Sequence, residues 1–295
     1  MKHILLTMRP GQWTKNLVVF AGLLFSKHLF DTQMMLTAGL AFLVFCALSG
    51  SVYLVNDLID IEADRRHPRK RNRPLASGKV SPASAVAAAV LFSGVGIALS
   101  FLVLGVSFGA VSLAYLLLNL GYSLRLKQLV LLDVMSIAVG FVLRAIGGVE
   151  ALKSLDPSVI LSPWLLVCTL FLSLLLALGK RRHELSLLEV NAGDHRRSLH
   201  DYSTALLDQL ISVVTASTAI AYAIYTIWPG TIEKFETRNL LYTVPFVVYG
   251  LFRYLYLLWR KEEGGNPSEL ILTDLPLAID VLLWLLVAGV VLYRF

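Results

Sequence analysis

Long apolar runs separated by polar stretches dominate the chain, and their lengths predict membrane-spanning helices. A helix needs about 20 apolar residues to cross the hydrocarbon core of a bilayer, because it rises about 1.5 Å per residue. Nine runs approach or exceed this length, and they occupy residues 14–30, 34–57, 82–104, 106–124, 129–150, 160–179, 205–228, 240–259 and 275–294. The first run is short and is interrupted by Lys27. The pattern therefore predicts an all-α, polytopic membrane protein with about nine transmembrane helices.

The composition supports the same class. The 295 residues are 57% hydrophobic and 16% charged, with a mean hydropathy of +0.71, whereas a soluble domain carries about 25% charged residues. No polar linker divides the chain, so we expect a single integral-membrane domain over residues 1–295. The two cysteines, Cys46 and Cys168, lie in apolar runs, and no disulfide framework or zinc-ligand spacing is present.

Basic residues gather in alternate loops. When the N-terminus is placed inside the cell, the inside segments hold most of the 26 lysines and arginines. Cytoplasmic loops of membrane proteins carry an excess of such residues. We therefore expect a protein of the cell membrane whose N-terminus and longest polar loops face the cytoplasm. The net charge of +6 then reflects topology, and it gives no argument for nucleic-acid binding.

A row of oxygen-bearing side chains closes the second apolar run. At about 100° per residue, a helix brings Asn56, Asp57, Asp60 and Asp64 to one narrow face. Carboxylates are costly in a membrane helix and usually mark a functional site. Oxygen ligands of this kind suit Mg²⁺, which completes its shell with water and substrate phosphates. We therefore predict a Mg²⁺ site on these four residues; the competing interpretation is a helix end whose carboxylates merely face water.

The loop that follows this acidic row is strongly basic. It includes Lys70 and Arg73, and the arginine offers a planar fork that matches phosphate oxygens. A metal site followed so closely by these cations could hold a diphosphate from both sides. The alternative is a topology signal that touches anionic lipid.

Two more polar segments lie on the predicted cytoplasmic face. In one of them, Lys127 could hold a phosphate and Tyr122 could orient it. In the other, Lys15 and Asn16 begin the first predicted helix, where a cation and amide groups can face an anion. Either segment taken alone also fits residues that anchor a helix at the membrane interface.

A third segment combines both signs of charge at a helix end. Lys180 and Arg181 precede Glu184 by four and three residues, which places them on one helical face. Such a cluster could bind phosphate or hydroxyl groups, or it could be a topology signal with a surface ion pair. Within the fifth apolar run, Arg144 should face the protein interior and needs a partner there.

Together these motifs resemble the UbiA superfamily of membrane prenyltransferases. The matching residues are Asn56-Asp57-x-x-Asp60-x-x-x-Asp64, then Arg73-Pro74-Leu75 with Gly78, then Tyr122 with Lys127. The resemblance extends over nearly the whole chain. It implies a helical bundle that binds Mg²⁺ and a diphosphate donor, with Asp57, Asp60, Asp64, Lys127 and Tyr122 as the catalytic residues.

The chain also departs from that family's usual pattern. Members ordinarily carry a second Asp-rich motif in a later cytoplasmic loop, where this sequence has Lys180-Arg181-Arg182-His183-Glu184-Leu185, and the isolated Asp194 and Asp201 do not rebuild it. The segments Arg9-Pro-x-Gln12-Trp13-x-Lys15-Asn16 and Leu143-Arg144 with Gly147 resemble the decaprenyl-phosphate phosphoribosyltransferase branch. That resemblance implies transfer of 5-phosphoribose from 5-phosphoribosyl diphosphate to a polyprenyl phosphate, for synthesis of cell-wall arabinan precursors.

Two other functions stay open at this point. One is transfer from a prenyl diphosphate to an aromatic acceptor of the 4-hydroxybenzoate type, which the missing second acidic motif disfavours. The other is a membrane transporter or lipid carrier, whose charges would be expected near the midplane rather than on one face. The sequence does not settle the lipid chain length or whether the protein forms a homo-oligomer.

Overall fold

The computed structural model describes residues 2–68, 70–188, 197–261, 270 and 273–293. Every element in these ranges is a helix, which confirms the predicted all-α class. The chain forms two compact units, residues 1–161 with 196–198 and residues 162–195 with 199–295. The expectation of a single domain stays a prediction, and each unit is described by itself.

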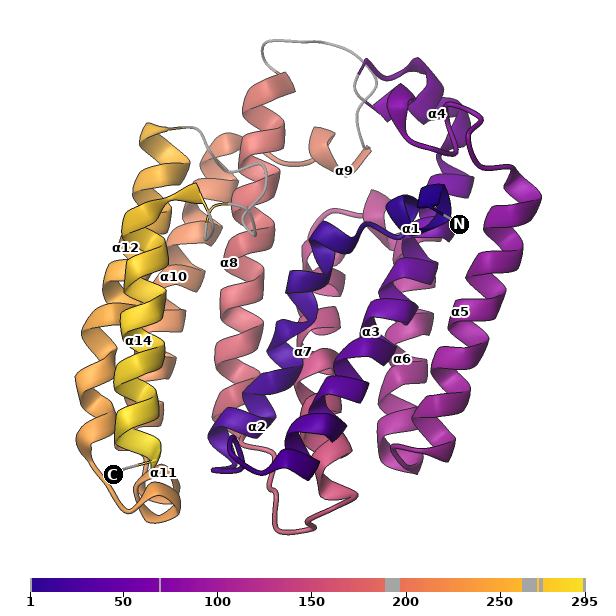
Figure 1. The fold of residues 1–295 in the computed structure, drawn as a ribbon. Coiled ribbons are helices and arrows are strands. Elements are labelled where there is room, and N and C mark those ends of the chain that lie inside the picture. The colour runs from indigo at the N-terminus through magenta and orange to yellow at the C-terminus, as the bar shows by residue number, and fades with distance from the viewer. Residues whose placement is uncertain (1, 69, 189–196, 262–269, 271–272, 294–295) are drawn as a thin grey trace. The chain divides into compact units, whose positions relative to one another are not determined.

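The first unit contains four long helices that run side by side, with shorter helices at their ends (Figure 1). Asp31 begins α3 by accepting hydrogen bonds from the backbone N–H groups of Gln33 and Met34, and Ser81 caps α5 in the same manner. In chain order the elements are α1 (Lys2–Thr7), η1 (Pro10–Phe20), α2 (Ala21–Phe25), α3 (Thr32–Ile59), α4 (Ile61–Arg66), η2 (Lys70–Asn72), α5 (Pro82–Leu102), α6 (Val106–Leu124), η3 (Leu126–Gln128) and α7 (Leu132–Lys153).

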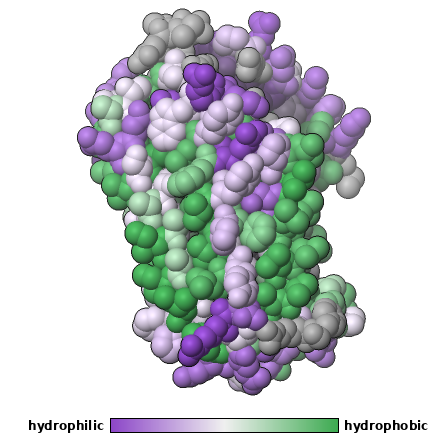
Figure 2. Space-filling model, turned by 90° about the vertical axis from the view of Figure 1, so that its left-hand side faces the viewer, coloured by the Kyte–Doolittle hydropathy of each residue, from purple (hydrophilic) through white to green (hydrophobic). Residues whose placement is uncertain are grey.

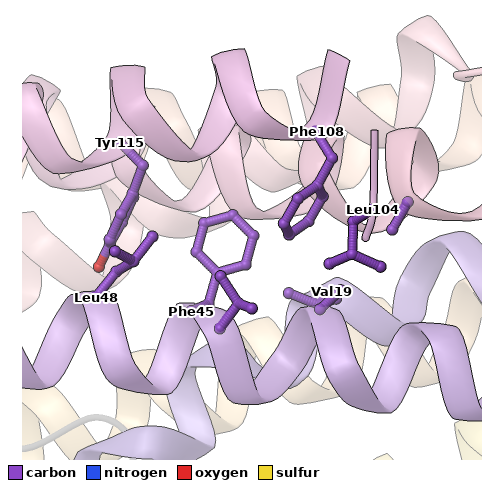
Figure 3. Close-up of a cluster of buried hydrophobic side chains, with 9 residues drawn as sticks. Val19, Phe45, Leu48, Leu104, Phe108 and Tyr115 are labelled. Atoms are coloured by element: carbon purple, nitrogen blue, oxygen red, sulfur yellow. The ribbon is translucent and has the colours of Figure 1, made fainter. Parts of the chain in front are cut away.

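Aromatic side chains pack the centre of this unit (Figure 3). The ring of Phe45 on α3 lies between Phe108 and Tyr115 of α6, with edge-on contacts at centroid distances of 5.7 and 5.2 Å. On α7, Gly148 permits a still closer approach, because a Cβ atom there would lie 2.1 Å from the carbonyl oxygen of Val19. The backbone of η1 therefore lies directly against α7.

The segment predicted as the first span, residues 14–30, is not a regular α-helix. It consists of the 3₁₀-helix η1 followed by the short helix α2, and the chain leaves this path at Lys27, which has a φ of 65°. Polar contacts accompany this irregular path. Arg9, which directly precedes η1, pairs with Asp57 of α3, and Asn16 within η1 hydrogen-bonds to Ser49 of α3 and Arg144 of α7.

The second unit is built from a further set of long helices. Its centre includes a hydrogen-bonded chain in which Trp284 donates to the Tyr222 hydroxyl at 2.8 Å, and that hydroxyl lies 2.7 Å from Thr243. Arg253 forms a two-point ion pair with Asp274, at 3.0 and 2.8 Å. The elements are α8 (Pro163–Leu188), α10 (Thr204–Ile227), α11 (Pro229–Phe235), η4 (Asn239–Thr243), α12 (Val244–Arg260) and α14 (Leu275–Tyr293), and the residues of α9 (Arg197–His200) are divided between the two units.

Within the described residues, eight helices are long and apolar enough to cross a membrane. Figure 2 shows a broad apolar band between polar ends on one face of the molecule. On α14 this character comes from a stripe of exposed residues at helical spacing, which includes Leu275, Leu282, Leu286 and Val290. Such a surface belongs in hydrocarbon rather than water. The chain is therefore an integral membrane protein, and its number of long helices is close to the nine expected.

Candidate active site

The acidic row lies where α3 ends and α4 begins. Asp60 joins the two helices with non-helical torsions (φ −93°, ψ 9°), yet its carbonyl still accepts a 2.8 Å hydrogen bond from the Asp64 N–H. The row therefore continues through the junction with nearly helical spacing. Asp57 and Asp64 are only 2% and 3% exposed, whereas 32% of the Asp60 side chain is accessible.

Two arginines neutralise the buried pair of carboxylates. Arg73 Nη1 donates to Asp57 Oδ1 at 3.1 Å and to Asp64 Oδ2 at 2.6 Å, so one guanidinium joins both. Arg9 adds a second ion pair to Asp57 and stacks over the ring of Tyr53 at 4.7 Å. Because unpaired carboxylates are costly to bury, these arginines explain how the acids can lie in the interior.

Lys127 makes the corresponding contacts with the other half of the row. Its Nζ donates to both oxygens of Asp60, at 2.9 and 3.1 Å, and to Asn56 Oδ1 at 3.3 Å. The lysine lies in η3 and is buried, and its backbone carbonyl accepts a 3.1 Å hydrogen bond from the Ser198 hydroxyl. The Lys127 amino group thus contacts Asn56, which lies 71 positions earlier in the sequence.

The basic loop is held in place by apolar anchors. Leu75 and Val80 are buried in a cluster with Met8, which directly precedes Arg9, and Leu54 of α3. Gly78 has a φ of +77°, which favours glycine, and it turns the loop back toward α5. Packing of these apolar residues therefore helps to position Arg73. Because Arg73 is paired with Asp57 and Asp64, it is more than a topology signal that contacts anionic lipid.

The side chains of this site carry equal numbers of opposite charges. The carboxylates of Asp57, Asp60 and Asp64 form ion pairs with three cations, Arg9, Arg73 and Lys127. Over the described part of the chain, no group of three Asp, Glu, His or Cys side chains is close enough to form a metal cage. The oxygen donors nevertheless fit Mg²⁺, because this ion usually takes one or two carboxylates and completes its shell with water and phosphates.

The structure distributes the other residues predicted for this site. Tyr122 is half-buried near the end of α6, and Lys70 is exposed in η2. Lys15 is half-buried in η1, whereas Asn16 is buried and accepts a 2.7 Å hydrogen bond from Arg144. The predicted inward-facing Arg144 is thus confirmed as buried. Arg9 belongs to the motif Arg9-Pro-x-Gln12-Trp13 quoted above, but it was not predicted as a site residue, because its partner Asp57 is 48 positions away in the chain.

The mixed-charge cluster lies on α8 in the second unit. Arg181 is 1% exposed and donates to Glu184 at 2.5 Å, and Lys180 Nζ lies 3.9 Å from the same carboxylate. The predicted shared helical face is therefore confirmed, while the assignment of these residues to a substrate site stays a prediction. Asp194 lies outside the described residues.

The fold and the site together define a class of protein. It is an integral membrane protein with a cluster of ion-paired carboxylates at the end of a long apolar helix. Comparison with known families identifies the class more closely. The model of the UbiA prenyltransferase family matches residues 16–273, and the chain belongs to this family. It is therefore a membrane transferase, as the motifs indicated.

Two curated relatives extend along most of the chain. A decaprenyl-phosphate phosphoribosyltransferase of Corynebacterium glutamicum is 34% identical over 94% of this chain and 82% of its own length. The enzyme of the same name from Mycolicibacterium smegmatis is 32% identical over 97% and 91%. Among solved structures, a UbiA homolog from Archaeoglobus fulgidus bound to GPP and Mg²⁺ has a TM-score of 0.72 over 98% of this chain and 99% of its own. Its identity is 18%, so it supports the fold alone.

Proposed function

We propose that this protein transfers 5-phosphoribose from 5-phosphoribosyl diphosphate to a polyprenyl phosphate such as decaprenyl phosphate, releasing diphosphate, in the synthesis of cell-wall arabinan precursors. The observation that carries the proposal is the set of three cations, Arg9, Arg73 and Lys127, directed onto the acidic row. Such a set is suited to a substrate rich in phosphate. The names of the two curated relatives support the choice of donor and acceptor.

The acidic residues would hold Mg²⁺ together with the donor diphosphate. Asn56, Asp57, Asp60 and Asp64 would supply the oxygen ligands, and the solved UbiA homolog of the same fold is itself bound to Mg²⁺. When bound, the metal supplies charge neutralisation for the leaving diphosphate. With these carboxylates holding the metal, Arg73 and Lys127 would be available to bind phosphate oxygens.

The reaction requires one bond to form and one to break at C1 of the ribose. An oxygen of the lipid phosphate bonds to C1, and the C1–oxygen bond to diphosphate breaks, with the electron pair leaving on diphosphate. The attacking phosphate is already anionic, so positioning matters more than a strong base. Lys127 and Arg73 stabilise the charge on the leaving group, and Tyr122 orients an oxygen.

The remaining predicted residues are assigned to phosphate groups of the two substrates. Lys180 and Arg181, held by Glu184, would bind the 5-phosphate or the lipid phosphate, and Lys15 and Lys70 add positive charge. A basic cluster in place of a second acidic motif favours a substrate with more phosphate and less hydrocarbon. The positive-inside pattern favours a cytoplasmic site in the cell membrane, where a water-soluble donor is accessible.

Purified protein in detergent would test the proposal. One reaction receives 5-phosphoribosyl diphosphate with decaprenyl phosphate, and a second receives a prenyl diphosphate with 4-hydroxybenzoate, each with and without Mg²⁺. Mass spectrometry detects the lipid products. We expect a phosphoribosylated lipid from the first pair only, lost on chelation.

Two outcomes would redirect the assignment. Product from the second pair alone would make the protein an aromatic prenyltransferase. Product from neither pair would contradict the proposed transfer and favour the transporter or lipid-carrier interpretation, which a liposome flux assay with polyprenyl phosphate would then examine.

A further inference from the structure

Arg144 places a positive charge in the interior of the first unit. It lies in the middle of the membrane-spanning helix α7 and is 7% exposed. Its Nε donates to Asn16 Oδ1 at 2.7 Å, Nη2 donates to the Tyr115 hydroxyl at 2.6 Å, and Nη1 donates to the Gly140 carbonyl at 3.1 Å. These contacts hold the guanidinium in one orientation.

All of these partners are neutral. The guanidinium also lies 4.7 and 4.9 Å from the ring centres of Tyr115 and Phe141, and among the described residues no carboxylate pairs with it. A buried charge without a counter-ion is costly, and membrane proteins keep such charges mainly where they act. Three of the five guanidinium N–H groups are used, so two donors remain for an anion.

A column of polar side chains connects Arg144 to the acidic row. Asn16 binds Arg144 and also donates to Ser49 of α3 at 3.3 Å. Ser49, Tyr53 and Asp57 follow one another at four-residue spacing on α3, so they share one face. Arg9 then joins Tyr53, on whose ring it stacks, to Asp57, with which it pairs. Arg144 is thus part of the same polar system, about two helical turns deeper along α3.

We propose that Arg144, oriented by Asn16 and Tyr115, is a phosphate subsite below the acidic row, in addition to the residues assigned above. The proposal rests on the proposed function for the identity of the two phosphate sources. These sources are the phosphate of the polyprenyl acceptor and the 5-phosphate of the sugar donor, and both present a tetrahedral dianion to a planar donor fork. A hydrocarbon chain would leave the charge without a counter-ion, so the subsite also selects against a prenyl diphosphate tail at this depth.

Ligand binding without turnover tests the subsite. Thermal unfolding in detergent is followed for wild type, Arg144→Met and Tyr115→Phe, with titrations of farnesyl phosphate, farnesol and 5-phosphoribosyl diphosphate with Mg²⁺. Binding to the folded state raises the unfolding temperature in a concentration-dependent way, which gives apparent dissociation constants. Farnesol is the matched ligand that keeps the hydrocarbon and lacks the phosphate.

We expect wild type to prefer farnesyl phosphate over farnesol, and Arg144→Met to weaken one phosphate ligand by about 10- to 100-fold, the range for a lost charge-assisted hydrogen bond. Loss of the farnesyl phosphate response alone assigns the subsite to the acceptor; loss of the sugar diphosphate response alone assigns it to the donor. Tyr115→Phe should weaken the same ligand by a smaller factor. If Arg144→Met does not fold, Arg144→Lys serves instead and should also weaken that ligand, because lysine lacks the fork.

Unchanged affinity for both phosphate ligands in the Arg144 variant would overturn the proposal, and so would a wild type that does not distinguish farnesyl phosphate from farnesol. This result is separate from the proposed function. A protein that binds phosphate through Arg144 but forms no phosphoribosylated lipid would keep the subsite and lose the proposed reaction.

Discussion

Replacing Arg73 by Met should expose how strongly the buried carboxylates depend on it. Arg73 donates to Asp57 at 3.1 Å and to Asp64 at 2.6 Å, and both acids are almost fully buried. Asp57 keeps Arg9 in the variant, whereas Asp64 loses the cation that pairs with it. The change therefore leaves Asp64 as a buried negative charge without a counter-ion.

The expected magnitude follows from burial. Breaking a buried ion pair by removing one partner costs about 3–5 kcal/mol. Arg73 itself is 26% exposed and water can reach part of the site, so we expect a loss of about 2–3 kcal/mol in the free energy of unfolding. Lys127→Met should cost only about 1 kcal/mol, because its partner Asp60 is 32% exposed. Arg65→Met, which breaks an exposed pair with Glu62, is the control and should stay within about 0.5 kcal/mol.

Unfolding in mixed micelles of increasing SDS content measures these differences. The double variant Arg73→Met with Asp64→Asn separates charge from packing, because it removes the uncompensated carboxylate and keeps its shape. We expect the double variant to regain at least half of the loss in stability while remaining inactive. If Arg73→Met unfolds like wild type, or if Asp64→Asn restores nothing, the account of the site as a buried ion-pair network is wrong.

Three further predictions concern other parts of the chain. Gly148→Ala should lower the unfolding temperature by several degrees, because its Cβ would lie 2.1 Å from the Val19 carbonyl; Gly94→Ala, with nothing within 4 Å, is the matched control and should be neutral or slightly stabilising. Asp60→Asn should abolish turnover with little loss of stability, since an amide oxygen still accepts from Lys127, and near-normal activity would contradict its proposed metal-ligand role. Arg253 lowers the pKa of Asp274 below its ordinary value, so Asp274→Asn should lower the unfolding temperature at pH 7, where the ion pair contributes fully. That difference should shrink as the pH falls below about 4 and wild-type Asp274 becomes protonated, and a pH-independent difference would exclude the ion pair as its cause.

The acidic row and the charged cluster on α8 could be predicted from the spacing of their residues along the chain. Asn56, Asp57, Asp60 and Asp64 lie close in the chain, and Arg181 and Glu184 are one turn apart, so the helical repeat alone brings them together. The positions of the eight long helices could be predicted as well, because runs of apolar residues are visible directly in the sequence. What is local in the chain could be predicted from it.

The partners of those residues could not be predicted in the same way. Lys127 meets Asn56 across 71 positions, and Arg144 meets Asn16 across 128. Such pairings depend on how helices pack, which is decided by contacts such as Gly148 against Val19 rather than by any local pattern. Arg9 was not predicted as a site residue for the same reason. The carboxylate with which it pairs, Asp57, is 48 positions away in the chain.

The 3₁₀ geometry of η1 has a consequence for how far the N-terminal segment reaches. With three residues per turn, Trp13, Asn16 and Val19 align on one side, while Gly11, Thr14 and Leu17 form the exposed side. The same geometry is more extended than an α-helix, rising about 2.0 Å per residue instead of 1.5 Å. Residues 10–25, in η1 and α2 together, can therefore extend about 30 Å, the thickness of the hydrocarbon core, with fewer residues than an α-helical span needs. At α-helical rise the same 16 residues would extend only about 24 Å, so the 3₁₀ geometry supplies the difference.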